Sequence, residues 1–100
     1  ALQSAGLGEM TELQKRETDV VLGSGGGGFS FAEEQIAHWL SGDKNPSPFA
    51  VSSSIAGMIS SELSIAFGLR GRSHTLSNGC TSATDALGNA LDLIRSGRST

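Results

Sequence analysis

Residues 73–97 have the sequence SHTLSNGCTSATDALGNALDLIRSG, in which a short strand pattern runs directly into a helix pattern. The apolar residues of the second part recur every three or four positions, as on one buried face of a helix. They are Ala83, Ala86, Leu87, Ala90, Leu91 and Ile94. We expect the hydroxyls of Thr81 and Ser82 to cap the first turn and Asp85 to complete a capping box. Gly97 is predicted to end the helix. Cys80 is the only cysteine, and it is predicted to lie at the N-terminus of this helix.

A position at a helix N-terminus bears on the reactivity of the Cys80 thiol. A helix N-terminus carries unpaired N–H groups and partial positive charge, which favour the nucleophilic thiolate form of cysteine. The same amides, that of Cys80 included, can hold an oxyanion when the sulfur attacks a carbonyl. The stabilisation is on the order of 1 kcal/mol, so a second activating group is still required. Position alone leaves open a buried cysteine without chemistry.

Neither histidine is expected to supply that activating group or a metal site. Six residues of extended strand span about 20 Å, which separates His74 from Cys80 within one chain. His38 falls in a helix pattern without a second ligand placed to share a metal ion with it. The sequence therefore predicts no metal and places the catalytic base, if there is one, outside residues 1–100 or in another subunit.

Length and charge limit the classes of function. The 100 residues suffice for one small domain, and a net charge of −3 does not favour a nucleic-acid partner or an anionic membrane surface. The sequence has no membrane-span pattern and a single cysteine, which fits a reducing compartment, so a cytoplasmic protein is predicted. We expect residues 1–100 to be an internal fragment of a longer chain, because the sequence lacks an initiator methionine and stops directly after a helix.

The remaining segments are predicted from apolar runs and glycine or proline boundaries. In the first part of the chain we expect the end of a helix at residues 1–7, closed by Gly6, then a solvated connector at 8–17 and a buried strand at 19–22. A helix is predicted at 30–41, opened by a Ser30–Glu33 capping box, and it is followed by a polar turn at 42–46 and a turn bracketed by Pro46 and Pro48. One helix is predicted from Val51 to Phe67, ended by Gly68–Gly71.

Residues 23–28, GSGGGG, formally satisfy the G-x-G-x-x-G pattern of dinucleotide-binding loops. That site also needs a second parallel strand after the helix, and the sequence has the polar turn there instead. No Gly-Lys-Ser/Thr follows, so a phosphate-binding P-loop is not indicated either. We interpret the glycines as backbone packed closely next to a cavity.

Several ordered motifs resemble a known family. They are Ser47–Phe49, Leu63–Gly71, Gly79–Ser82, Asp85–Gly88 and Ile94–Gly97. Together they are similar to the N-terminal half of a β-ketoacyl synthase of the thiolase superfamily, above all to the dissociated (type II) ketosynthases of fatty-acid and aromatic polyketide synthesis. The resemblance covers the chain from Val20 onward. It implies an α/β fold, layered α/β/α/β/α, with residues 1–100 as an internal fragment of its N-terminal half.

The resemblance also implies an activity and partners. Cys80 would accept an acyl group from acyl carrier protein, its backbone N–H forming half of an oxyanion hole, before decarboxylative Claisen condensation with malonyl-acyl carrier protein. The two histidines that the family uses lie beyond the cysteine, so this piece alone would be inactive. No cofactor is implied other than the phosphopantetheine of the carrier protein. The partner subunit would be a second copy, paired near the strand before Cys80, or a chain-length-factor-like subunit.

This sequence departs from the family at a few positions. The family commonly has Gly at Ala83, Pro at Arg72 and Asn at Gly57. Gly26 and Ala50 correspond to often bulky positions of the acyl pocket, Gly26 with a one-residue gap allowed. Small side chains there suggest a pocket for a longer or bulkier acyl chain.

Three alternatives remain open. Another thiolase-superfamily acyltransferase acting on coenzyme A esters would share the cysteine. A non-catalytic, cavity-shaping partner subunit would typically lack Cys80. A glycine-loop nucleotide-binding module would depend on residues 23–28 instead.

Overall fold

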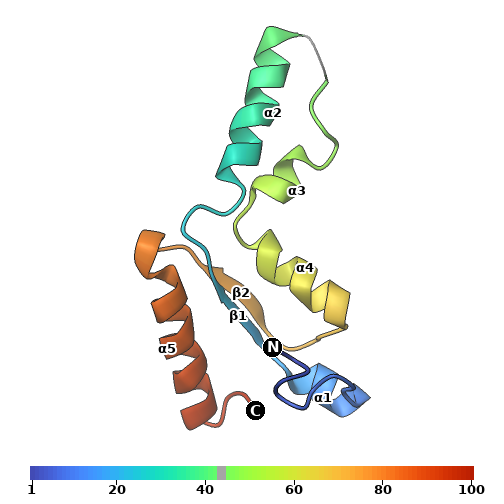
Figure 1. The fold of residues 1–100 in the computed structure, drawn as a ribbon, viewed down its shortest axis with the longest axis vertical. Coiled ribbons are helices and arrows are strands. Elements are labelled where there is room, and N and C mark those ends of the chain that lie inside the picture. The colour runs from blue at the N-terminus through green and yellow to red at the C-terminus, as the bar shows by residue number, and fades with distance from the viewer. Residues whose placement is uncertain (43–44) are drawn as a thin grey trace.

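The computed structural model describes residues 1–42 and 45–100 (Figure 1). The elements in chain order are α1 Glu12–Glu17, β1 Val20–Gly23, α2 Phe29–Ser41, α3 Ala50–Ser54, α4 Met58–Phe67, β2 Ser73–Leu76, the 3₁₀ turn η1 Gly79–Thr81, and α5 Ser82–Arg95. This mixture of helices and parallel strands agrees with the predicted α/β class. Residues 43 and 44 of the predicted polar turn lie outside the described residues.

β1 and β2 form a parallel pair in the register Val20↔Ser73 to Gly23↔Leu76. Both strands were predicted, β1 as a short apolar run that ends in glycine and β2 as the short strand that runs into the helix after Cys80. In Figure 1, α5 lies along one side of this pair and α4 along the other, and both helices contact both strands. These elements of the described chain thus form a helix–sheet–helix unit.

α2 and α3 pack on each other and project from this unit as an arm (Figure 1). The Ser47 amide donates to Gln35 Oε1 at 2.6 Å and ties the loop before α3 to α2. The predicted Ser30–Glu33 capping box is wrong, because α2 begins one residue earlier and Gly28, which has no side chain to cap with, is its N-cap. Its end at Ser41, followed by the left-handed Gly42, is as predicted.

The single helix predicted from Val51 to Phe67 is divided into α3 and α4. Ile55 is extended, with φ −79° and ψ 125°, and α4 starts only at Met58. The Ser54 hydroxyl donates to the Ala50 carbonyl, and the hydroxyls of Ser60 and Ser61 donate to the Gly57 carbonyl. Serine hydroxyls compete for backbone groups in this way and weaken a continuous helix. Gly68 is left-handed and ends α4, as expected.

The connector predicted at residues 8–17 contains a short helix, α1. Its start is a true capping box, in which the Thr11 hydroxyl accepts from the Gln14 amide and Gln14 Oε1 accepts from the Thr11 amide. Residues 1–7 form hydrogen-bonded turns. The Leu7 amide donates to the Leu2 carbonyl and the Gly6 amide to that of Gln3, with Gly6 at φ +73°. These are the bonds of a Schellman helix end, as predicted for Gly6.

α5 matches its predicted span, and its predicted face is only partly covered. Ala86 is 6% exposed and Ala90 is half-buried, whereas Leu87 is 74% and Ile94 57% exposed. At the start of α5 the buried residue is Ser82, which is 2% exposed and was not part of the predicted apolar face. The two strands therefore cover one edge of the apolar face and leave the other edge open.

The loop before β2 is fastened to the start of β1 by Asp19. Its Oδ1 accepts from the Arg72 amide at 2.6 Å, next to the bond from the Val20 amide to the Arg72 carbonyl at 2.7 Å. A side chain on Gly71 would collide with the Thr18 carbonyl and with Asp19 Oδ1. Position 72, where the family commonly has proline, thus uses an N–H group that proline lacks.

This contact predicts that Arg72→Pro destabilises the full-length protein. The Asp19 carboxylate loses its donor, and a hydrogen bond to a charged group contributes about 1.5–3 kcal/mol. Thermal unfolding of the purified protein measures the loss. Arg72→Ala keeps the amide and is the matched control, for which we expect an unchanged melting temperature; equal losses in both variants would contradict the role of the amide.

Candidate active site

Cys80 lies in the turn that joins β2 to α5. The chain leaves β2 at Leu76, turns at Gly79 with φ +67°, and passes through η1 before α5 begins at Ser82. The cysteine is the middle residue of η1 and is exposed. The predicted position of Cys80 at the start of the helix is therefore correct. The backbone N–H of Cys80 is in the first turn of the helical segment, where amides have no intrahelical acceptor.

The predicted caps of α5 are wrong, because the hydroxyls and the carboxylate have other partners. Ser82 Oγ accepts from the Asn78 amide at 2.8 Å and donates to the Gly79 carbonyl at 2.7 Å. Asp85 Oδ2 accepts from Asn78 Nδ2 at 3.0 Å and lies 3.2 Å from the Thr81 hydroxyl. The 3₁₀ turn places Asn78 over the first turn of α5, where these side chains reach it. Asn78 was not among the site residues predicted from the sequence.

The glycine-rich loop after β1 packs behind this turn. A side chain on Gly23 would collide with the backbone of Ser82 and Ala83, and a Cβ on Gly25 would lie 3.4 Å from the Gly79 carbonyl oxygen. The later glycines of the loop face the arm: a side chain on Gly28 would collide with the Ser53 carbonyl. Glycine at positions 23 and 28 thus allows the close backbone approach that was predicted for this loop.

The two predicted acyl-pocket positions lie in different surroundings. A Cβ added to Gly26 would meet no atom of the described residues within 4 Å. Ala50 is the first residue of α3 and lines a groove of about 340 Å³ between α2 and α3. Its other lining residues are Ala32, Gln35, Ile36, Val51, Ser54 and Ile55. The structure therefore does not bring Gly26, Ala50 and Cys80 into one cavity.

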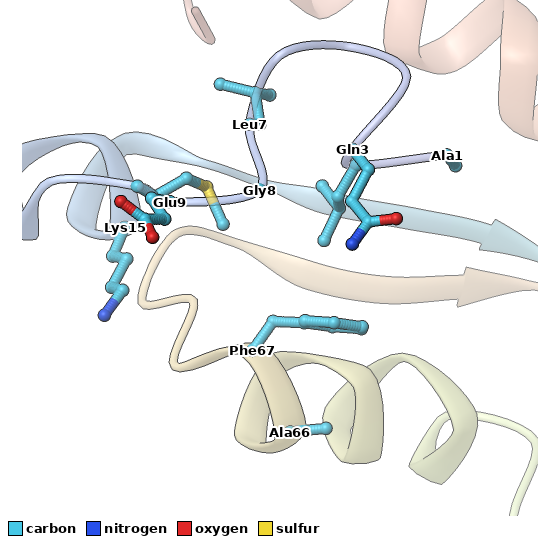
Figure 2. Close-up of a pocket in the computed structure, with 10 residues that line it drawn as sticks. Ala1, Gln3, Leu7, Gly8, Glu9, Lys15, Ala66 and Phe67 are labelled. Atoms are coloured by element: carbon cyan, nitrogen blue, oxygen red, sulfur yellow. The ribbon is translucent and has the colours of Figure 1, made fainter.

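A hollow of about 750 Å³ lies away from Cys80 (Figure 2). It is formed by the N-terminal segment and the end of α4, with Phe67 extending from α4 beneath the strands. Its charged lining residues are Glu9 and Lys15, and the Lys15 ammonium is paired with Glu12 at 3.3 Å. This lining supplies no nucleophile, so the candidate site stays at the turn.

The histidines are placed away from the turn. His38 is on α2, and His74 Nε2 on β2 lies 3.0 Å from Asn89 Oδ1, in the third turn of α5. Across residues 1–42 and 45–100, no group of three or more His, Cys, Asp or Glu residues could hold a metal ion. A search of the same residues finds no helix long and apolar enough to cross a membrane.

The described residues thus combine a parallel strand pair, a helix and, in the turn between them, an exposed cysteine. The family described as "Beta-ketoacyl synthase, N-terminal domain" matches residues 1–100. The chain is 38% identical over 100 residues to 3-oxoacyl-[acyl-carrier-protein] synthase 2 of Vibrio harveyi, covering 97% of this chain and 23% of that protein.

Other relatives agree. The synthase 2 of Vibrio cholerae is also 38% identical, over 97% of this chain and 23% of its own length. The chloroplastic 3-oxoacyl-[acyl-carrier-protein] synthase I of Arabidopsis thaliana is 32% identical, over 97% of this chain and 21% of its own length. The chain belongs to the β-ketoacyl synthase family and matches its N-terminal domain. It spans less than a quarter of the length of these curated relatives.

The packing of Gly23 predicts that Gly23→Ala destabilises the full-length protein. The added methyl group would overlap backbone atoms of Ser82 and Ala83, and overpacking of this kind costs about 1–3 kcal/mol. Denaturant unfolding measures the loss. Gly57→Ala is the control, because a Cβ there meets open space among the described residues; a Gly23→Ala variant as stable as Gly57→Ala would contradict the close approach.

Proposed function

We propose that the chain is part of the N-terminal half of a β-ketoacyl-[acyl carrier protein] synthase with Cys80 as its nucleophile. The observation that carries this proposal is the exposed Cys80 in the 3₁₀ turn between β2 and α5, in a chain of this family. The names of the relatives support acyl carrier protein as the substrate carrier. The helix–sheet–helix unit is proposed to form layers of an α/β/α/β/α thiolase-like fold.

In the first step, the Cys80 sulfur attacks the carbonyl carbon of an acyl thioester carried on the phosphopantetheine of acyl carrier protein. The new C–S bond forms at Cys80, and the carrier sulfur leaves and takes up the proton of the thiol. The Cys80 N–H and the positive end of α5 are directed at the negative charge that develops on the carbonyl oxygen.

In the second step, malonyl-acyl carrier protein loses carbon dioxide, and the resulting carbanion attacks the carbonyl of the Cys80 thioester. A carbon–carbon bond forms, the C–S bond to Cys80 breaks, and the carrier holds a chain longer by two carbons. Splitting the condensation through a covalent enzyme intermediate replaces one difficult step by two easier ones. The groups that assist decarboxylation are proposed to lie outside residues 1–100.

The proposed partner, besides acyl carrier protein, is a second subunit that pairs along β2. In the described residues β2 pairs with β1, and its other edge is free for a further strand. A second copy of the chain or a chain-length-factor-like subunit would fill this edge. No resident cofactor is proposed, and a single free cysteine fits the reducing cytoplasm as the place of action.

The proposal predicts that Cys80→Ala abolishes acyl transfer to the full-length protein. Incubation with an acyl-carrier thioester, followed by mass measurement of the peptide that contains residue 80, should show the acyl mass in wild type and its absence in the variant. Gly57→Ala should be acylated like wild type. An unmodified peptide in wild type, or an acyl group on another residue, would contradict the assignment.

The correspondence of Gly26 and Ala50 to acyl-pocket positions of the family, and not a cavity shared with Cys80 among the described residues, predicts the acyl-chain preference. Gly26→Ile and Ala50→Phe should each shift the preference of the full-length enzyme toward shorter chains, because the new side chains take up room that a long or bulky acyl chain would use. Competition between carrier thioesters of different length measures the ratio of kcat/KM values, and we expect a change of about tenfold or more. Gly57→Asn is the control. An unchanged ratio in both test variants would contradict a pocket at these positions.

A further inference from the structure

One carboxylate oxygen joins the residues on both sides of Cys80. Asp85 Oδ2 accepts from Asn78 Nδ2 at 3.0 Å, and the Thr81 hydroxyl lies 3.2 Å from the same oxygen. Asn78 is two residues before the cysteine and Thr81 follows it directly, whereas Asp85 is in the first turn of α5. The carboxylate therefore connects the entry and the exit of the cysteine turn to the helix.

A second, buried set of bonds joins Ser82, at the start of α5, to the entry of the turn. Ser82 Oγ, in a residue that is 2% exposed, accepts from the Asn78 amide and donates to the Gly79 carbonyl. Gly79 has φ +67°, and a glycine can leave such a conformation easily unless contacts hold it. The Ser82 bonds reach the backbone of Asn78 and Gly79, and the Thr81 hydroxyl also lies 3.2 Å from the Asn78 carbonyl oxygen. The Asp85 carboxylate is the acceptor that contacts the side chains of both Asn78 and Thr81.

We propose that Asp85 is a positioning residue for Cys80. Its two contacts fix the 3₁₀ turn, and with it the direction of the cysteine sulfur relative to the Cys80 amide. This inference rests on the proposed function, in which the sulfur and that amide act on the same carbonyl group. Hydrogen bonds to an ionised acceptor are roughly twice as strong as neutral ones, which suits an exposed contact of this kind.

The alternative role for Asp85 is electrostatic. In that role the negative charge of Asp85, and not its hydrogen bonds, would affect the acylation of Cys80, so removing the charge alone would change the pH dependence of the rate. The two roles separate in the variant Asp85→Asn, because the amide oxygen still accepts from Asn78 and Thr81 while the charge is gone. Asp85→Ala removes both the acceptor and the charge.

The experiment compares full-length wild type with Asp85→Asn, Asp85→Ala and Asp92→Ala. Asp92 is the matched control, an exposed acid of α5 whose carboxylate makes no hydrogen bond or ion pair within the described chain. Two quantities are measured: the single-turnover rate of Cys80 acylation over a range of pH, and amide hydrogen exchange in the peptide that contains residues 78–82.

We expect Asp85→Ala to slow acylation on the order of ten- to a hundredfold, the size of effect that a displacement of about 1 Å produces. Amide exchange in the turn should become faster in the same variant. Asp85→Asn should restore both quantities to within about twofold of wild type, with the same pH midpoint. Asp92→Ala should match wild type. Thr81→Val should slow acylation less than Asp85→Ala, and the double variant should be no slower than Asp85→Ala.

Three results would overturn the inference. Unchanged exchange in Asp85→Ala would show that the carboxylate does not hold the turn. Faster exchange with unchanged acylation would show that the turn does not position the sulfur. A changed pH midpoint shared by Asp85→Asn and Asp85→Ala would assign the effect to charge. If wild type is not acylated at all, the proposed function fails, and the role of Asp85 in positioning a nucleophile fails with it, while the exchange rates still report on the turn itself.

Discussion

The close approach of Gly23 to the backbone of Ser82 and Ala83 is the contact on which the site depends. Gly23 is the last residue of β1 and is paired with Leu76, the last residue of β2. The chain that leaves β2 must therefore cross the end of β1 before α5 can begin. Only a residue without a side chain leaves room for this crossing. The position of the cysteine turn is thus set by a glycine 57 positions earlier in the sequence.

Small hydroxyl residues serve the same close packing in the helices. Ser60 of α4 is fully buried and Ser82 of α5 is 2% exposed, and both face the interior where larger apolar residues are the usual choice. A buried hydroxyl without a partner is costly, but these two donate to the nearby carbonyls of Gly57 and Gly79. The hydroxyls of Ser60 and Ser82 are therefore satisfied although both helices lie close to the narrow pair of strands.

The sequence predicted the parts of the fold that depend on local pattern. β1, α2 and α5 lie within about a residue of their predicted bounds, because each is an apolar run or period bounded by glycine, and β2 was predicted only as a short strand before Cys80. The break between α3 and α4 was missed because the apolar period continues through Ile55, although its backbone is extended. α1 was missed because it has hardly any apolar face, and its Thr11–Gln14 capping box was the only signal.

The candidate site shows the same limit more sharply. Cys80 could be placed from sequence, since the strand and helix patterns meet there. The hydrogen-bond partners of Ser82 and Asp85 could not be predicted from sequence. A hydroxyl or carboxylate at the start of a helix can accept from the free amides of the first helical turn, or from donors of the preceding segment where that segment folds over the helix. The 3₁₀ turn brings Asn78 into that position, and its side chain and amide take the places that a capping box assigns to the helix backbone.

The apolar face of α5 illustrates why burial is harder to predict than secondary structure. A three-and-four period shows which face of a helix is apolar, but it does not show which neighbouring element covers each part of that face. Two strands lie only about 5 Å apart, so they cover a single row of residues, here Ser82, Ala86 and Ala90. The adjoining row of the same helix, with Leu87 and Ile94, remains exposed. The covered row fixes the start of α5 and hence the position of the turn that contains Cys80. The small residues of this row, and not the large apolar residues of the predicted face, therefore position the site.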